Sequence, residues 1–120
     1  MVLATLKTRA EFLRVRGGRR WSTPSLVLET RPRPGATGPD EEARFGFTVS
    51  KKIGGAVVRN RVRRRLRALV AALKPSEVRP GCDYVVIARP GAVGRSFNEL
   101  EADLQQALSR VHRPVSQRRH

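Results

Sequence analysis

Six arginines fall within the nine positions from Arg59 to Arg67, and one asparagine, Asn60, interrupts them. Two lysines, Lys51 and Lys52, precede this run. A guanidinium group carries a permanent charge and a planar fork of donors that fits a phosphate group. An asparagine amide both donates and accepts hydrogen bonds. Side chains of these types at this density favour binding of a phosphate-rich polyanion over bond-making chemistry.

The composition extends this interpretation to the whole chain. Among 120 residues there are 25 lysines and arginines but only 10 acidic residues, a formal net charge of +15. Such a chain repels itself unless it meets a polyanion, and nucleic acid is the first candidate because its phosphates release counterions on binding. An anionic membrane is the second, but no segment approaches the ~18 consecutive apolar residues of a membrane span. We therefore expect no membrane partner.

The arginine run also contains apolar residues at helical spacing. On a helical wheel they form one stripe wide enough to pack on a sheet, made of Val58, Val62, Leu66, Leu69, Val70 and Leu73. No acidic residue occurs between Glu42 and Glu77, whereas ordinary exposed helix faces mix both signs at i±4. We predict a docked helix, from the glycine pair before it to a stop after Lys74, that holds the arginines as a fixed cationic surface.

The role of Asn60 stays open at this point. It lies near the middle of the cationic face, while Arg59 and Arg65 lie at the two borders of the apolar stripe. An asparagine near a helix start often bonds the backbone. Its amide is equally suited to a base edge, a ribose hydroxyl or a phosphate. The chemistry of the side chain favours neither alternative.

The remaining segments predict a single small domain over residues 1–111. Two capping boxes, at Thr8 and Ser96, predict helices over residues 8–16 and 96–111. Alternating or continuous apolar residues predict strands over 25–30, 44–50 and 83–88, and a brief strand or turn precedes the first of these. The order of helix, two or three strands, helix, strand and helix indicates an α+β fold, a sheet with helices packed against it.

Two segments lack such patterning. Residues 31–43 contain three prolines and two glycines and are predicted to be a mobile hairpin loop that pairs with no strand. Residues 112–120 are predicted to be a basic, disordered tail. The acids of the loop, Asp40, Glu41 and Glu42, cannot be fixed there in a metal-binding geometry. One cysteine, Cys82, permits no intrachain disulfide, and the histidines show no zinc-ligand spacing. We thus expect neither catalytic nor metal-ligating residues in the chain.

The stretch FTVSKKIGGAVVRNRVRRRLR, residues 47–67, resembles the signature of the bacterial ribonuclease P protein subunit. The matching residues are Val49, Ser50, Lys51, Lys52, Gly54, Ala56, Val57, Arg59, Asn60, Arg61, Arg64 and Arg67. Weaker similarity covers EFLRV near the start and DYVVIAR after the arginine helix. The resemblance implies an α-β sandwich of order αβββαβα with a left-handed βαβ crossover through the arginine helix. The general rule for such crossovers predicts the opposite hand.

The resemblance also implies a function. In this family the active site lies in a large RNA, and the protein binds that RNA and the 5′ leader of precursor tRNA. It thereby assists endonucleolytic removal of the leader, which gives the mature tRNA 5′ end. It strengthens the binding of substrate and of divalent metal, Mg²⁺, which the RNA subunit mainly holds. We accordingly expect a cytoplasmic protein, bound 1:1 to ribonuclease P RNA, with precursor tRNA as the second partner.

Carried over residue by residue, the resemblance implies two surfaces. The catalytic RNA would face Lys51, Lys52, Arg59, Asn60, Arg61, Arg63, Arg64 and Arg67. The leader would lie in a cleft between the first helix and the sheet, with Phe12, Arg16 and Thr48. Arg16 and Glu29 stand where the family often has aromatic residues, which weakens a stacking model for the leader. Plain core packing is the alternative role for Phe12.

Three other functions compete with this one. A small basic RNA-binding protein without a role in cleavage, such as a ribosomal protein, has the same composition. The RNR helix between two strands argues against it. A self-sufficient nuclease requires clustered carboxylates that hold metal, which the sequence does not provide. A DNA-binding module requires side chains that read base edges, and a surface made almost entirely of arginine offers few of them.

Overall fold

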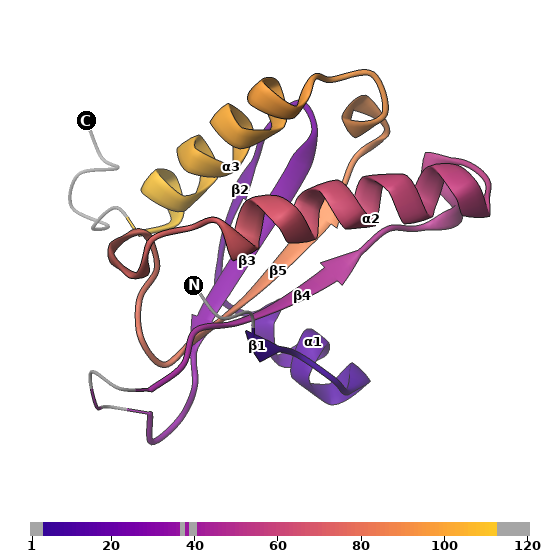
Figure 1. Ribbon diagram of the computed structural model, residues 1–120. Coiled ribbons are helices and arrows are strands. Elements are labelled where there is room, and N and C mark those ends of the chain that lie inside the picture. Colours follow the sequence, from indigo (N-terminus) through magenta and orange to yellow (C-terminus); the bar gives the residue numbers. More distant parts are fainter. Residues whose placement is uncertain (1–3, 37, 39–40, 113–120) are drawn as a thin grey trace.

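The computed structural model describes residues 4–112 except 37, 39 and 40. A five-stranded sheet separates two layers, with α2 and α3 on one face and α1 on the other (Figure 1). The elements are β1 (Ala4–Thr5), α1 (Arg9–Val15), β2 (Arg19–Ser22), β3 (Leu26–Pro32), β4 (Arg44–Thr48), η1 (Lys51–Ile53), α2 (Ala56–Ala71), η2 (Pro75–Glu77), β5 (Cys82–Ala88), η3 (Pro90–Ala92) and α3 (Phe97–Val111). The α+β class and the order αβββαβα are confirmed, with the two-residue β1 added in front.

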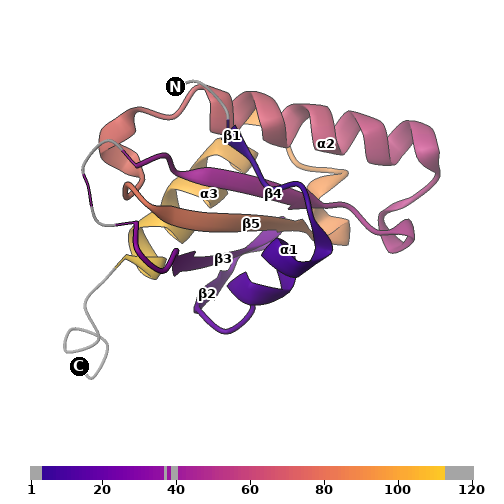
Figure 2. The same ribbon diagram turned by 90° about the horizontal axis from the view of Figure 1, so that it is seen from below.

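The strand order in the sheet is β1-β4-β5-β3-β2. β4 pairs in parallel with β1 and β5, and β3 pairs antiparallel with β2 and β5. Figure 2 views the sheet from the α1 side, so that α2 lies behind it; β4 and β5 both point to the right, with β5 below β4. If the view is turned so that both strands point upwards, β5 lies to the right of β4, and the connecting helix α2 lies behind the sheet. The crossover is therefore left-handed, as the family resemblance implied.

The apolar core is divided unevenly between the two faces. Almost all buried apolar residues of the described chain lie between the sheet and α2 with α3, and the stripe of α2 contributes Val62, Leu66, Leu69 and Val70. The cluster under α1 consists only of Leu6, Val15 and Val85, with Phe12 and Ile87 packed against it. The α2 and α3 layer therefore supplies most of the burial that stabilises the fold.

Both predicted capping boxes are present. The Thr8 hydroxyl accepts from the Glu11 amide at 3.2 Å, and the Ser96 hydroxyl accepts from the Glu99 amide at 3.1 Å. Phe97 continues the helical spacing of apolar residues in this helix, but it is 42% exposed. It is the first residue of α3, one turn ahead of Leu100, where full burial begins.

The arginine helix ends earlier than predicted, at Ala71 rather than at Lys74. Lys74 has an extended backbone, with φ of −80° and ψ of 148°. The following Pro75 explains this, because a proline disfavours helical conformation in the residue before it. Pro75 then opens η2, where its missing N–H costs nothing.

The two segments without pattern are shorter than predicted. Arg31 and Pro32 belong to β3 and pair with Asp83 and Cys82, so the prediction that the loop 31–43 forms no ladder is wrong at its start. β2 pairs with β3 only as far as Thr30, so β3 is an edge strand at Pro32, where the missing N–H of a proline is tolerated. The mobility of the rest of the loop stays a prediction, and residues 37, 39 and 40 lie outside the described residues.

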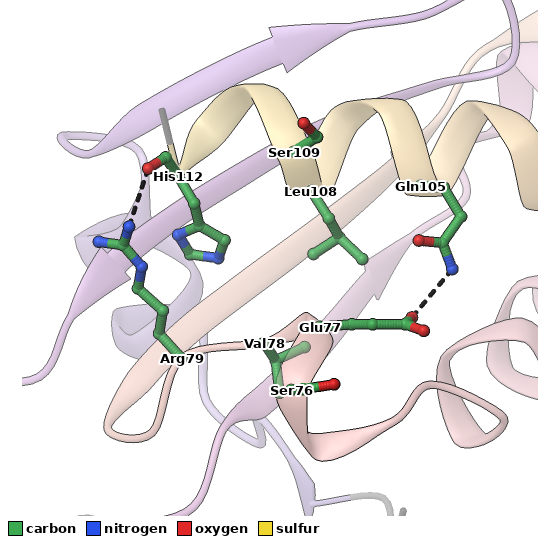
Figure 3. A pocket seen from close by; sticks show the side chains of 8 residues that line it. All are labelled: Ser76, Glu77, Val78, Arg79, Gln105, Leu108, Ser109 and His112. Atoms are coloured by element: carbon green, nitrogen blue, oxygen red, sulfur yellow. Dashed lines mark hydrogen bonds between the residues drawn. The ribbon is translucent and has the colours of Figure 1, made fainter. Parts of the chain in front are cut away.

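His112 was assigned to the basic tail, but the structure places it in the folded domain as the C-cap of α3. Its Nε2 is hydrogen-bonded to the Tyr84 hydroxyl at 2.6 Å, and its carbonyl accepts from Arg79, as Figure 3 shows for the latter bond. Burial, followed by the charges of Arg79 and Arg19, lowers the pKa of His112 to about 4. The ring is therefore neutral at pH 7. Residues 113–120 lie outside the described part of the chain.

Candidate RNA-binding interface

The cationic residues of α2 form one outward surface. Asn60, Arg61, Arg64 and Arg67 are exposed, and Arg59 and Arg63 are half-buried. The eight salt bridges among the described residues use arginines of other elements and leave the arginines of α2 without a carboxylate partner. Because Val62 and Leu66 are 2% and 1% exposed, the helix is firmly packed beneath this surface.

Three contacts orient side chains on α2. Arg63 Nη1 donates to Asn60 Oδ1 at 3.0 Å, so the Asn60 side chain orients a neighbouring arginine instead of capping the backbone. Arg67 lies over the Phe47 ring, 5.7 Å from its centroid. Arg65 donates to the Arg95 carbonyl at 3.1 Å and thereby ties α2 to the loop before α3. Arg65, at the border of the apolar stripe, is thus a structural residue.

Lys51 and Lys52 lie in η1, between the end of β4 and the start of α2, and both are exposed. Ile53, 7% exposed, anchors η1 in the core. Gly54 then turns the chain with a φ of +152°, a backbone conformation that other residues rarely adopt. The two lysines are therefore fixed at the beginning of the cationic surface.

A groove of about 450 Å³ lies between α1 and the face of the sheet that is turned away from α2 and α3. Its lining comes from α1 and the residues before and after it, and from β3, β4 and β5: Lys7, Thr8, Arg9, Phe12, Leu13, Arg16, Glu29, Thr48, Val85 and Ile87. The structure thus brings the three predicted cleft residues, Phe12, Arg16 and Thr48, together in one groove. That the leader occupies it stays a prediction.

Phe12 serves the core and the groove together. Its ring lies directly over Gly46 of β4, where an added Cβ would be 2.5 Å from two ring atoms. Only a glycine permits this approach of α1 to the sheet. The ring remains half-buried and lines the groove. The two roles considered for Phe12 from the sequence are therefore compatible.

One buried carboxylate, Asp83 at the start of β5, holds α1 against the sheet. It accepts from Arg14 of α1 at 2.7 Å, from Arg33 at 2.7 Å, and from Arg44 through two donors at 2.9 and 2.8 Å. Burial acts to raise the pKa of Asp83, but the hydrogen bonds from Arg44, Arg33 and Arg14 outweigh it and hold that pKa below its ordinary value. The sequence did not predict this cluster of ion pairs. Its only sign in the sequence was a single acidic residue at the start of an apolar strand.

The metal-ligating side chains of the described residues are not arranged to hold a Mg²⁺ ion. Within residues 4–112, apart from the three omitted positions, no three His, Cys, Asp or Glu side chains are grouped so as to hold a metal ion. Asp83 is the most buried acid, and both of its oxygens are used by guanidinium groups. No helix of the described chain is both long and apolar enough to cross a membrane.

The chain is a single α-β sandwich domain with a left-handed crossover. Its helix α2 presents arginines without carboxylate partners, and a cation-rimmed groove lies on the opposite face of the sheet. These features are typical of a small protein that binds a polyanion. The comparisons identify which one. The family model described as Ribonuclease P matches residues 3–112. The chain belongs to the ribonuclease P protein family.

Relatives and solved structures agree. The chain is 48% identical over 110 residues to the ribonuclease P protein component of Paramagnetospirillum magneticum, covering 91% of this chain and 83% of the relative. It is 48% identical over 109 residues to that of Gluconacetobacter diazotrophicus, covering 88% and 89%. The structure of the Staphylococcus aureus RNase P protein superposes with a TM-score of 0.77 at 26% identity, covering 92% of this chain and 97% of that one.

The function follows from this membership. The protein is the protein component of the ribonuclease P ribonucleoprotein endonuclease, acts in tRNA processing, and has the ribonuclease P RNA as its partner. The alternative of a ribosomal-type protein without a role in cleavage is set aside.

Proposed function

We propose that the protein binds the ribonuclease P RNA through an arginine face, made of Lys51, Lys52, Arg59, Asn60, Arg61, Arg63, Arg64 and Arg67. The observation that carries this proposal is the absence of any described carboxylate opposite the arginines of α2. Elsewhere in the same molecule arginines are paired: Arg14, Arg33 and Arg44 converge on one aspartate. Guanidinium groups without carboxylate partners, on a firmly packed helix, are available to bind phosphates instead of neutralising acids of the protein itself.

The groove under α1 is the proposed site for the 5′ leader of precursor tRNA. Its rim carries Lys7, Arg9 and Arg16, which attract phosphates, and its floor contains Val85 and Ile87. Single strands bind to grooves that combine cations with a flat aromatic ring on which a base stacks. Phe12 is the only aromatic residue in the lining, so stacking is limited to one ring, and Arg16 supplies a guanidinium plane one turn later.

The two surfaces meet at the end of β4. Thr48 lines the groove, and Lys51 begins the arginine face three residues later. A leader in the groove and an RNA on the arginine face would therefore approach each other at this point. We propose that the protein, bound 1:1 to the RNA in the cytoplasm, holds the leader beside the catalytic RNA. The RNA supplies the active site and binds the Mg²⁺.

The first test of the proposal is a reconstitution. Purified protein alone should not cleave precursor tRNA, because its described residues offer no carboxylate cluster for metal. Added to a catalytic ribonuclease P RNA, it should lower the magnesium concentration at which half-maximal cleavage occurs. A gel assay over a magnesium series measures both results. RNA-free cleavage that disappears when the protein's own acids are mutated contradicts the proposal.

Phe12→Ala tests the groove. The change should weaken binding of precursor tRNA to the holoenzyme by roughly 5- to 150-fold, the range of one base–aromatic stack, while binding of leaderless mature tRNA stays the same. Val15→Ala is the matched control, because Val15, the last residue of α1, is fully buried but does not line the groove. It should lower stability without separating the two substrates. Equal losses for both substrates in Phe12→Ala would assign Phe12 to the core alone.

A further inference from the structure

Strand β4 places Phe47 next to the arginine face. Its side chain packs against the apolar core on the side of the sheet that α2 and α3 cover, whereas the next residue, Thr48, lines the groove on the opposite face. Phe47 pairs in register with Val86, a fully buried residue of β5, so the sheet fixes its place. Phe47 is only half-buried, and it can therefore contact a side chain of α2 at the surface.

Arg67, in the second half of α2, makes that contact. Its Cζ atom lies over the Phe47 ring, 5.7 Å from the ring centroid, which is within the distance of about 6 Å at which a ring face attracts a cation. Arg67 is exposed, and the salt bridges among the described residues do not include it. The ring is thus the contact that orients this arginine.

An aromatic ring orients an arginine in a different way from a carboxylate. Arg14, Arg33 and Arg44 are held by Asp83, whose negative charge offsets part of theirs. The Phe47 ring carries no charge, so Arg67 keeps its full positive charge while its position is restricted. A ring of this kind therefore holds a guanidinium group in place and leaves its charge and its N–H donors available for a phosphate.

We propose that Phe47 is a positioning residue of the RNA interface: it holds the Arg67 guanidinium group in the orientation in which that group contacts the ribonuclease P RNA. A side chain that is already ordered loses less conformational freedom on binding, and each flexible side chain that must be immobilised lowers affinity. This inference rests on the proposed function of the arginine face. It adds to that face an uncharged residue of the sheet, which acts through Arg67.

The experiment is a double-mutant cycle, measured by filter binding of the ribonuclease P RNA to the full chain. Phe47→Leu should weaken binding roughly 2- to 10-fold, because Arg67 must then be ordered on binding. The salt dependence of its affinity should stay parallel to that of the parent, because no charge is lost. In the Arg67→Gln background the same change should leave the affinity unchanged, since no guanidinium group remains to be positioned. Phe47→Tyr keeps the ring and should bind like the parent.

Arg64→Gln provides the matched cycle. Arg64 is exposed on the same helix, and neither of the two contacts between a guanidinium group and a ring among the described residues involves it. Phe47→Leu should therefore cost the same factor in the Arg64→Gln background as in the parent. A merely structural role of Phe47 would instead affect the Arg64→Gln and Arg67→Gln backgrounds equally. Phe47→Met supplies a second side chain without a ring, and urea denaturation shows whether each variant is folded under the binding conditions.

An NMR measurement on the free parent protein needs no variant. The ring current of Phe47 should shift the side-chain proton resonances of Arg67 upfield, and ordinary chemical shifts would contradict the inference. It is also wrong if Phe47→Leu and Phe47→Met bind the RNA as tightly as the parent, or if their losses persist in the Arg67→Gln background. Failure of the proposed function is a separate result: Arg67→Gln would then change neither the affinity nor its salt dependence.

Discussion

Replacing Asp83 by alanine should lower the free energy of unfolding by about 3–5 kcal/mol, the usual cost of removing one partner from a buried ionic network. The side chain of Asp83 is fully buried, and the change would leave Arg14, Arg33 and Arg44 facing one another with no carboxylate between them. Urea denaturation followed by circular dichroism measures the effect. A midpoint unchanged from that of the parent would mean that the network contributes nothing to stability.

Glu11→Gln is the control for that experiment. Glu11 lies 3.0 Å from Arg44, but both side chains are partly exposed, and a glutamine preserves the capping box. Removal of this ion pair should cost far less stability than the loss of Asp83, because exposed ion pairs contribute little. The contrast between the two variants separates the buried carboxylate from the general effect of lost negative charge.

The same network predicts a pH dependence. Because the pKa of Asp83 is lower in the folded protein than in the unfolded chain, its contribution to stability is complete well above the unfolded value of about 3.9. The contribution is lost as the pH falls through the folded value. The parent should therefore lose stability steeply below about pH 4, whereas Asp83→Asn, which does not titrate, should be less stable at pH 7 but lose less on acidification.

The triple variant Arg61→Gln, Arg64→Gln and Arg67→Gln should weaken binding of the ribonuclease P RNA by roughly 100-fold at 0.15 M salt. Release of counterions from each phosphate contact contributes about 1 kcal/mol at that concentration. The slope of log affinity against log salt should fall by about 2–3 units for the three residues, and the difference from the parent should vanish near 1 M. A filter-binding titration over a salt series measures both. Parallel lines would show that these arginines are merely solvated.

Single variants serve as controls for the triple one. Arg64→Gln should flatten the slope by somewhat less than one unit. Arg110→Gln should not change the slope, because Arg110 is on α3, where its charge lies over the Trp21 ring of β2. Asn60→Ala should lower affinity without changing the slope, because the amide is uncharged. Leu66→Ala should cost about 2–5 kcal/mol of stability and leave the slope of the folded protein intact. These outcomes distinguish phosphate contacts from directed hydrogen bonds and from packing.

The sequence predicted the features that depend on local chemistry. The apolar stripe of α2, both capping boxes and the alternation of β4 all rest on neighbours within a few residues, and all were confirmed. The start of η2 at Pro75 has an equally local cause, although the sequence placed the end of α2 at Lys74 instead of Ala71. The arginine face could therefore be outlined from residues 51–67 alone.

What the sequence could not predict depends on residues far apart in the chain. Asp83 forms ion pairs with the arginines at positions 14, 33 and 44. No local sequence pattern indicates that these residues are partners. The close contact of Phe12 with Gly46 requires the packing of α1 on β4 to be known. The left-handed crossover contradicts the general preference for right-handed ones and came only from the family resemblance. The ion pair between Arg20 and Glu29 likewise became visible only when β2 and β3 were paired.

The uneven division of the core has a consequence for how this protein changes over evolutionary time. Selection for a stable fold acts mainly on the residues between the sheet and α2 with α3, where most of the buried apolar side chains lie. The α1 side depends on a small cluster and on Asp83. If the groove binds the leader as proposed, exposed groove positions such as Arg16 carry little of the folding energy, and we expect them to vary with the leaders of a given genome more than the scaffold beneath them does.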